Sequence, residues 1–150
     1  MRTILPRFTL YLLLSMAGEA AAKAQPAAGR GGQLLAPCPV SPNCVSSLAT
    51  DDRHRIAPLA ITRDLATAMT RLEWVLAQRT DTTLVSADKG YLRVEFRTFL
   101  GFVDDGEFLL DRDREVIHVR SASRLGWSDL GKNRRRLEEI RRAFSGEATP

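Results

Sequence analysis

The feature that most constrains the fold is a series of four short β-like runs separated by turn residues. The runs are TTLVSA (82–87), YLRVEFRTFL (91–100), EFLLDR (107–112) and EVIHVRSA (115–122). In the second run apolar and charged side chains alternate, so that Leu92, Val94 and Phe96 share one face. DKG, DDG and DRDR are predicted as tight turns, because Gly and Asp tolerate unusual φ angles. Such short connections predict an antiparallel meander.

A helical pattern precedes these runs, in residues 59–80. Apolar residues recur there at spacings of three and four, which places them on one face of a helix: Ile61, Leu65, Met69, Leu72 and Leu76. Pro58 suits the start of such a helix because its missing N–H costs nothing there. Trp74 is interpreted as a core or half-core residue.

A second helix is expected from about Asp129 to Phe144, capped by the side chain of Ser128 or Asp129. Its predicted buried stripe consists of Leu130, Leu137, Ile140 and Phe144. The expected fold class is therefore α+β. An antiparallel sheet of about four strands would be flanked by an N-terminal and a C-terminal helix on one face.

The first 24 residues have the features of a secretory signal peptide. Arg2 and Arg7 precede an apolar run at residues 8–17, and the small residues Ala22 and Ala24 follow. Cleavage is expected after Ala24, with Ala22 as the alternative. The mature protein would then be periplasmic or secreted. The alternative is an uncleaved membrane anchor, but the apolar run is about half the roughly 20 residues that a spanning helix needs.

Residues 25–37 are rich in Ala, Gly and Pro and are predicted to form a flexible linker before a single globular domain at 38–145. Cys38 and Cys44 are the only cysteines. In an oxidising compartment this pair predicts a disulfide, worth about 2 kcal/mol for so short a loop. The C-x5-C spacing, without a second Cys/His pair, argues against a redox dithiol or a metal site.

The net charge and its distribution limit which classes of binding partner are expected. The net charge is +4, and removal of residues 1–24 takes away three basic residues and one acidic residue, which lowers it to +2. Opposite charges are interleaved, so nucleic acid is not an expected partner. The basic segment 132–142 is interpreted as a solvated helix face, with contact to anionic lipid as the alternative.

The strongest candidate site is the polar turn before the last helix, where hydroxyls and guanidinium groups stand next to a helix N-terminus. Such a terminus attracts anions, and Arg offers paired donors to carboxylate or phosphate. The candidate anion-binding residues are Arg120, Ser121, Ser123, Arg124, Ser128, Asp129, Asn133 and Arg135. In the alternative interpretation, the two arginines Arg120 and Arg124 pair with Asp104, Asp105 or Asp129, and the serines only cap turns.

Signals for catalysis are weak. The DDGE segment could bind a hard cation, but a polar hairpin turn is the simpler interpretation. His118 could join Ser121 or Ser123 in a hydrolytic triad, yet G-x-S-x-G is missing and His118 alternates with apolar residues as in an ordinary strand. We therefore predict no catalytic residue, metal or cofactor. An enzyme of unknown, hydrolase-like class using the same polar cluster is the alternative.

Three blocks of sequence resemble a known family. CPVSPNCVSS, FVDDGEF and VRSASRLGWSDLGKNRRRLEEIR are similar to the hallmark segments of the bacterial and plastid family called domain of unknown function 1499. The resemblance extends over about residues 38–144 and implies a compact exported or membrane-associated domain. The expected function is binding, at the cell envelope, of a small anionic ligand, an envelope protein or an anionic lipid surface.

Overall fold

A computed structural model describes residues 35–146. The predicted signal peptide and most of the predicted linker lie outside these residues. Six strands and two helices follow one another in the described range, in this order: β1 (Cys44–Ser46), β2 (Leu59–Ala60), α1 (Ala68–Ala77), β3 (Thr82–Asp88), β4 (Tyr91–Arg97), β5 (Val103–Asp111), β6 (Val116–Ser123) and α2 (Lys132–Ser145).

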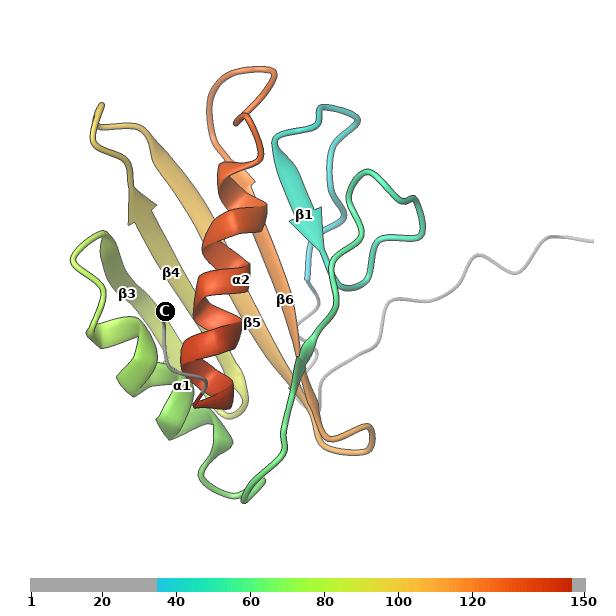
Figure 1. Ribbon diagram of the computed structural model, residues 1–150, viewed down its shortest axis with the longest axis vertical. Helices are drawn as coiled ribbons and strands as arrows, with labels where there is room; N and C mark the ends of the chain where they lie inside the picture. The colour runs from blue at the N-terminus through green and yellow to red at the C-terminus, as the bar shows by residue number, and fades with distance from the viewer. Residues whose placement is uncertain (1–34, 147–150) are drawn as a thin grey trace, which may run out of the picture.

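The strands form one antiparallel sheet in the order β1-β6-β5-β4-β3, and β2 also pairs with β6. Strands β3 to β6 are the meander that the sequence predicts, so the α+β class is confirmed. The two short edge strands, β1 and β2, fall in a segment predicted as a loop. Figure 1 shows α1 and α2 lying in front of the sheet, with α2 across β5 and β6.

One main core fills the space between the sheet and the helices. The alternating residues Leu92, Val94 and Phe96 of β4 are almost fully buried in it, as the pattern predicts. The helices contribute apolar side chains to the same core: Leu72, Val75 and Leu76 from α1, and Leu137, Ile140 and Phe144 from α2. A second, smaller cluster joins Leu35 to Tyr91 and Leu109, whose side chains lie on the other face of the sheet.

The predicted turn at DDG is wrong. Asp104 and Gly106 lie inside β5, paired with Phe96 and Val94 of β4, and the hairpin turn is formed by residues 98–102 instead. The glycine serves packing rather than chain reversal. A Cβ at Gly106 would overlap the Phe96 ring and lie 2.7 Å from Cγ2 of Val94, so the missing side chain makes room for its strand neighbours.

The first helix begins later than predicted, at Ala68 instead of near residue 59. Leu59 forms a strand pair with Ile117, and Pro58 precedes that strand instead of a helix. Ile61 is nevertheless buried, because the extended chain after β2 still crosses the core. Trp74 is 64% exposed, contrary to prediction, since the buried side of α1 is formed by its other apolar residues.

The last helix begins three residues later than predicted. Lys132 is its first residue, preceded by Gly131 in the left-handed conformation with φ 75°. Leu130 also has a positive φ, 53°, and its side chain is 84% exposed, so its place in the predicted stripe is wrong. The rest of that stripe is buried, as predicted.

Candidate functional site

The candidate residues lie where β6 ends, in the turn at residues 124–131, and in the first turns of α2. They fall into three environments. Successive residues of a strand point to opposite faces of a sheet. Arg120 and Ser121, adjacent in β6, therefore have their side chains on different sides of the molecule.

The first environment is a buried cluster around Asn133, which is completely inaccessible to solvent. The hydroxyl of Ser121 donates to Oδ1 of Asn133 at 2.5 Å. The Asn133 amide donates to the Ser123 hydroxyl at 3.0 Å and to the carbonyl of Asn43 at 3.1 Å. Ser121, Ser123 and Asn133 are thus brought together, and they join α2 to β6 and to the segment before β1.

This cluster continues into a buried ion pair that was not predicted from the sequence. The guanidinium of Arg136 donates to Oδ1 of Asn133 at 2.9 Å and to Oδ2 of Asp104 at 2.8 Å. It also lies over the Phe96 ring, 4.4 Å from the centroid. Arg136 and Asp104 each expose about 3% of their side chains. A signal was present, since Asp104 shares a strand face with Phe108 and is an acidic residue on an apolar face.

The second environment is the opposite face of the sheet, where Arg120 and Arg124 form ion pairs. Arg120 donates to Glu107 at 2.8 Å. Arg124 donates from Nε and Nη2 to the two oxygens of Asp105, at 2.9 Å each, and from Nη2 to Glu95 at 2.5 Å. The pairing of Arg124 with Asp105 is one that the alternative interpretation named.

These contacts shift the pKa values of their members. The hydrogen bonds from Arg124 hold the pKa of Asp105 below its usual range, against the opposing effect of burial, and Arg93 adds to the lowering. Burial, reinforced by a hydrogen bond to Glu107, raises the pKa of Tyr91 to about 12. Asp105 is therefore ionised at neutral pH, and arginines donate to the carboxylates of this face.

The third environment is the exposed turn and the start of α2. The Ser128 hydroxyl accepts the N–H of Leu130 at 3.2 Å. The Asp129 carboxylate accepts the N–H groups of Gly131 at 2.9 Å and Asn133 at 2.8 Å. A carboxylate of the chain itself therefore lies at the N-terminus of α2, but the N-cap residue is Gly131 and not the predicted Ser128 or Asp129. Arg135 donates to the Leu130 carbonyl at 2.8 Å and is otherwise exposed.

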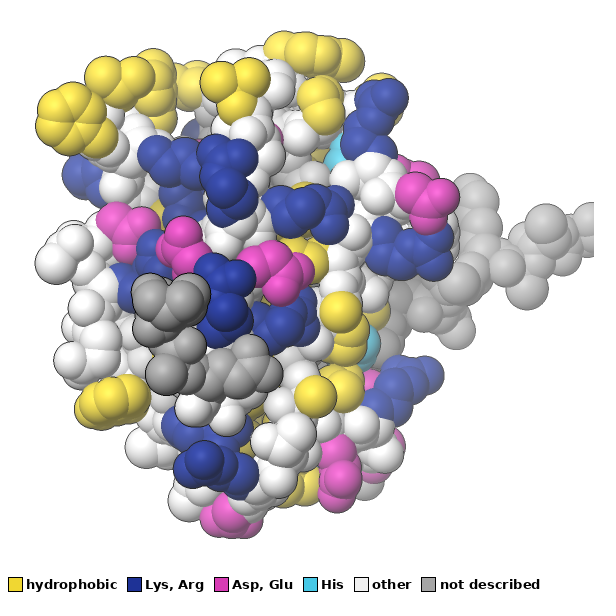
Figure 2. Space-filling model, viewed as in Figure 1, with side chains coloured by type: hydrophobic (Ala, Val, Ile, Leu, Met, Phe, Trp, Pro, Cys, Tyr) yellow, Lys and Arg dark blue, Asp and Glu magenta, His cyan; other side chains and the backbone are white. Residues whose placement is uncertain are grey.

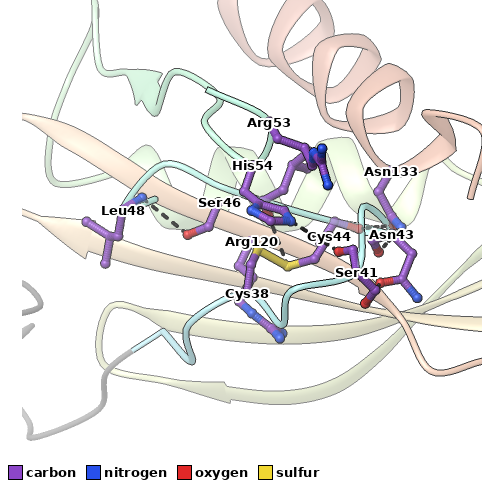
Figure 3. The surroundings of a disulfide bond; sticks show 12 residues. Cys38, Ser41, Asn43, Cys44, Ser46, Leu48, Arg53, His54, Arg120 and Asn133 are labelled. Carbon is purple, nitrogen blue, oxygen red and sulfur yellow. Dashed lines mark hydrogen bonds between the residues drawn. A yellow bond between two sulfur atoms is a disulfide. The ribbon is translucent and has the colours of Figure 1, made fainter. Parts of the chain in front are cut away.

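The predicted disulfide between Cys38 and Cys44 is present, and Figure 3 shows it beside Arg120, Ser46 and His54. The loop that it closes contacts the turn directly. Asn43 accepts the backbone N–H of Ser123 at 2.9 Å, and its side-chain amide donates to the carbonyl of Gly126 at 2.6 Å. The disulfide loop and the turn are therefore held together as one unit.

His118 lies on the face opposite Ser121 and Ser123, so the triad considered from the sequence is not assembled. Nδ1 of His118 is instead 3.1 Å from the Ser47 hydroxyl, and Nε2 is 3.4 Å from Asp111. In a hydrolytic triad the serine faces Nε2 and the carboxylate faces Nδ1. Here the nitrogens are exchanged, and the Ser47 oxygen also accepts the backbone N–H of Val119, so this contact ties the chain after β1 to β6.

Among residues 35–146, no group of three or more His, Cys, Asp or Glu side chains is arranged to hold a metal ion. Within the same range, neither helix has the length and apolar character needed to cross a membrane.

Fold and contacts together define a small α+β domain whose last helix is fixed by polar side chains to an antiparallel sheet and a disulfide loop. Residues 34–144 match the model of a family described as "Protein of unknown function (DUF1499)". Because the match covers most of the chain, the protein belongs to this family, as its motifs indicated. No curated protein and no solved structure gives a significant match.

We expect Asn133→Ala to lower the free energy of unfolding by about 3 kcal/mol. The substitution leaves the Ser121 hydroxyl and one Arg136 donor buried without their acceptor, and such groups cost about 1–3 kcal/mol each. Urea denaturation followed by circular dichroism measures the change. Arg135→Ala, at an exposed position of the same helix, should change stability by no more than about 0.5 kcal/mol. Equal effects of the two substitutions would contradict a structural role for the Asn133 cluster.

A second prediction concerns pH. Because the folded-state pKa of Asp105 is lowered, its carboxylate contributes stability that is fully present above the unfolded-state pKa, about 3.9. That contribution is lost as the pH falls through the folded-state pKa. Asp105→Asn should therefore cost about 1 kcal/mol at pH 7, the size of a partly exposed ion pair, and less at pH 3. Urea titrations at both pH values test this, and a gap that widens in acid would disprove it.

Proposed function

We propose that this protein is an exported binding domain of the cell envelope. It recognises an anionic ligand or partner through the turn at 124–131 and the first turn of α2. The observation that carries this proposal is that the residues of the predicted cluster have two different roles. The buried Asn133 cluster, together with Asn43, fixes the turn, while beside it Arg135 is exposed to solvent and Lys132 is half-buried.

The set of residues that can bind a ligand is smaller than the set predicted from the sequence. Ser121, Ser123 and Asn133 use their hydrogen-bonding groups on one another, so they position the site instead of binding at it. Arg135 donates one hydrogen bond to the Leu130 carbonyl, and the rest of its guanidinium faces solvent. Lys132 makes no ion pair or side-chain hydrogen bond within residues 35–146.

An incoming anion would meet these two cations rather than the N–H groups of the helix. The Asp129 carboxylate already accepts the N–H of Asn133. Arg124 is held by two carboxylates on the face of the sheet away from α2, so it is not part of this pair of cations although it is 39% exposed.

Export rests on two features that agree. The N-terminal 24 residues have the pattern of a secretory signal, and the folded domain contains a disulfide. Disulfides of this kind persist in the periplasm and outside the cell, whereas cytosolic thiols are kept reduced.

Export is tested by producing the full chain in a bacterium with a periplasm. We expect the protein in the periplasmic fraction, with a new N-terminus at Gln25 and with Cys38 and Cys44 resistant to alkylation until a reductant is added. A variant lacking residues 2–24 should stay in the cytoplasm with both thiols reactive. Recovery of the uncleaved chain with free thiols in the cytoplasm would refute export.

Anion recognition is tested by isothermal titration with inorganic phosphate, pyrophosphate and citrate. Lys132→Gln combined with Arg135→Gln should weaken binding of the best of these ligands about tenfold or more, because charged hydrogen bonds contribute about 1.5–3 kcal/mol. Arg112→Gln, an exposed arginine in the turn between β5 and β6, is the matched control and should bind as the unchanged protein does. Equal affinity of the double variant and the control would remove the site.

A further inference from the structure

Large apolar side chains are exposed at the end of the molecule that carries the 124–131 turn. Phe99 of the β4–β5 hairpin is fully exposed, and Trp127 of the turn is 68% exposed. We call five such residues the apolar tips: Phe99, Leu100, Leu125, Trp127 and Leu130. Figure 1 shows the hairpin and the turn at the top of the molecule, and Figure 2 shows apolar side chains along that edge.

The two segments that bear the tips are neighbours held in place. Strand β5 lies between β4 and β6, and the N–H of Arg124 donates to the carbonyl of Val103 at 3.3 Å. On the other side of the turn, Asn43 donates to the Gly126 carbonyl at 2.6 Å. The apolar tips therefore protrude from one end of a single framework.

Local bonds also fix the conformation of each segment. In the hairpin, the N–H of Thr98 donates to the Phe102 carbonyl at 2.8 Å, and the N–H of Gly101 donates to the Thr98 carbonyl at 2.9 Å. In the turn, Leu130 is kept at φ 53°, a conformation uncommon for a leucine, with its side chain in solvent. Backbone strain that directs an apolar side chain into water points to a function for that side chain.

Basic side chains lie close to the apolar tips. Figure 2 shows dark blue side chains directly below the apolar edge. Arg97 ends β4 beside the hairpin, and Lys132 and Arg135 follow the turn. Asp105 and Glu95 are paired with Arg93 and Arg124, whereas Asp129 keeps its charge because it accepts only backbone N–H groups. With Arg97, Lys132 and Arg135 added, cations outnumber carboxylates at this end.

We propose that this end of the domain docks on an anionic lipid bilayer and inserts the apolar tips into its interfacial layer. Separate protruding tips suit a soft interface, whereas a stable protein interface needs about 800 Å² of matched surface on each partner. Trp and Phe favour the membrane–water boundary, and nearby Lys and Arg are attracted to anionic headgroups. This inference rests on the proposed function and specifies its partner, because Lys132 and Arg135 contact the anions in both.

The chain supplies its own spectroscopic reporter and control. Trp74 and Trp127 are the only tryptophans, and both are about two-thirds exposed, but Trp74 is on α1, away from the apolar tips. In Trp74→Phe, only Trp127 fluoresces, and in Trp127→Phe, only Trp74 does. Both proteins carry the same N-terminal apolar run, so a difference between them does not come from that run.

The experiment adds vesicles of equal parts phosphatidylglycerol and phosphatidylcholine to each full-length protein. We expect the Trp127 emission to shift to the blue and to be quenched by brominated acyl chains, while the Trp74 emission changes little. Leu125→Ser combined with Leu130→Ser should lower the partition coefficient about tenfold or more in the Trp74→Phe background. Leu84→Ser combined with Val85→Ser, at exposed positions of β3, should leave it unchanged.

Three results would overturn the inference: no response of Trp127, equal responses of the two reporters, or equal insertion into pure phosphatidylcholine vesicles. A silent Trp127 together with phosphate or citrate binding that depends on Lys132 and Arg135 would overturn membrane docking alone and leave the proposed function intact. Insertion into anionic vesicles that Lys132→Gln and Arg135→Gln do not weaken would remove those two cations as the anion contacts.

Discussion

The buried contact between Arg136 and Asp104 is the constraint on which the rest of the fold depends. Removing both charges from water costs several kcal/mol per ion, and only close pairing with further hydrogen bonds compensates for that cost. Here the pair is 2.8 Å apart, Asn133 accepts a second hydrogen bond from the guanidinium, and the Phe96 ring covers it. A rotation or shift of α2 would break these contacts. The pair therefore fixes α2 to the start of β5 and sets how the helix lies on the sheet, in the orientation that buries Leu137.

The same contacts determine the shape of the exposed end. Asn133 connects Arg136 to Ser121 and to the Asn43 carbonyl, and Asn43 holds the turn through Gly126. The disulfide restrains the loop that contains Asn43. A chain of polar contacts thus runs from the core to the surface. Polar contacts hold the turn in its conformation, and its apolar side chains are largely exposed to solvent.

Strand periodicity explains which parts of the fold and of the site could be predicted from the sequence. Period-two alternation in β4 and the apolar spacing of α2 depend on local geometry, so β3 to β6 and most of the α2 stripe followed from the sequence alone. The DDG segment was wrongly predicted as a turn because Gly106 is required for packing: a side chain there would overlap Phe96 on the neighbouring strand. Such pairing is not visible in the sequence of one strand.

The candidate cluster shows the same limit for function. Arg120 and Ser121 are neighbours in sequence, but strand geometry sends them to opposite faces. Helix periodicity then brings Ser121 to Asn133, twelve residues away. Proximity in the sequence located the polar region around the end of β6, but it placed in one site side chains that lie on opposite faces of the sheet. The disulfide could be predicted because only two cysteines exist, so no choice of partner arose.

The arginines of α2 show why a count of charges does not locate a binding surface. Arg134 donates to the carbonyls of Arg53 and Arg55, and Arg141 donates to the carbonyls of Ala57 and Pro58. These long side chains attach the helix to the chain between β1 and β2 and use donors that an anion would need. The segment 132–142 is thus largely a set of structural contacts. Lys132 and Arg135 in the first turn of α2 keep donors for an anion, as does Arg142 near the other end of the helix. Only the first turn lies next to the apolar tips, and this coincidence favours that end of the domain as a binding surface.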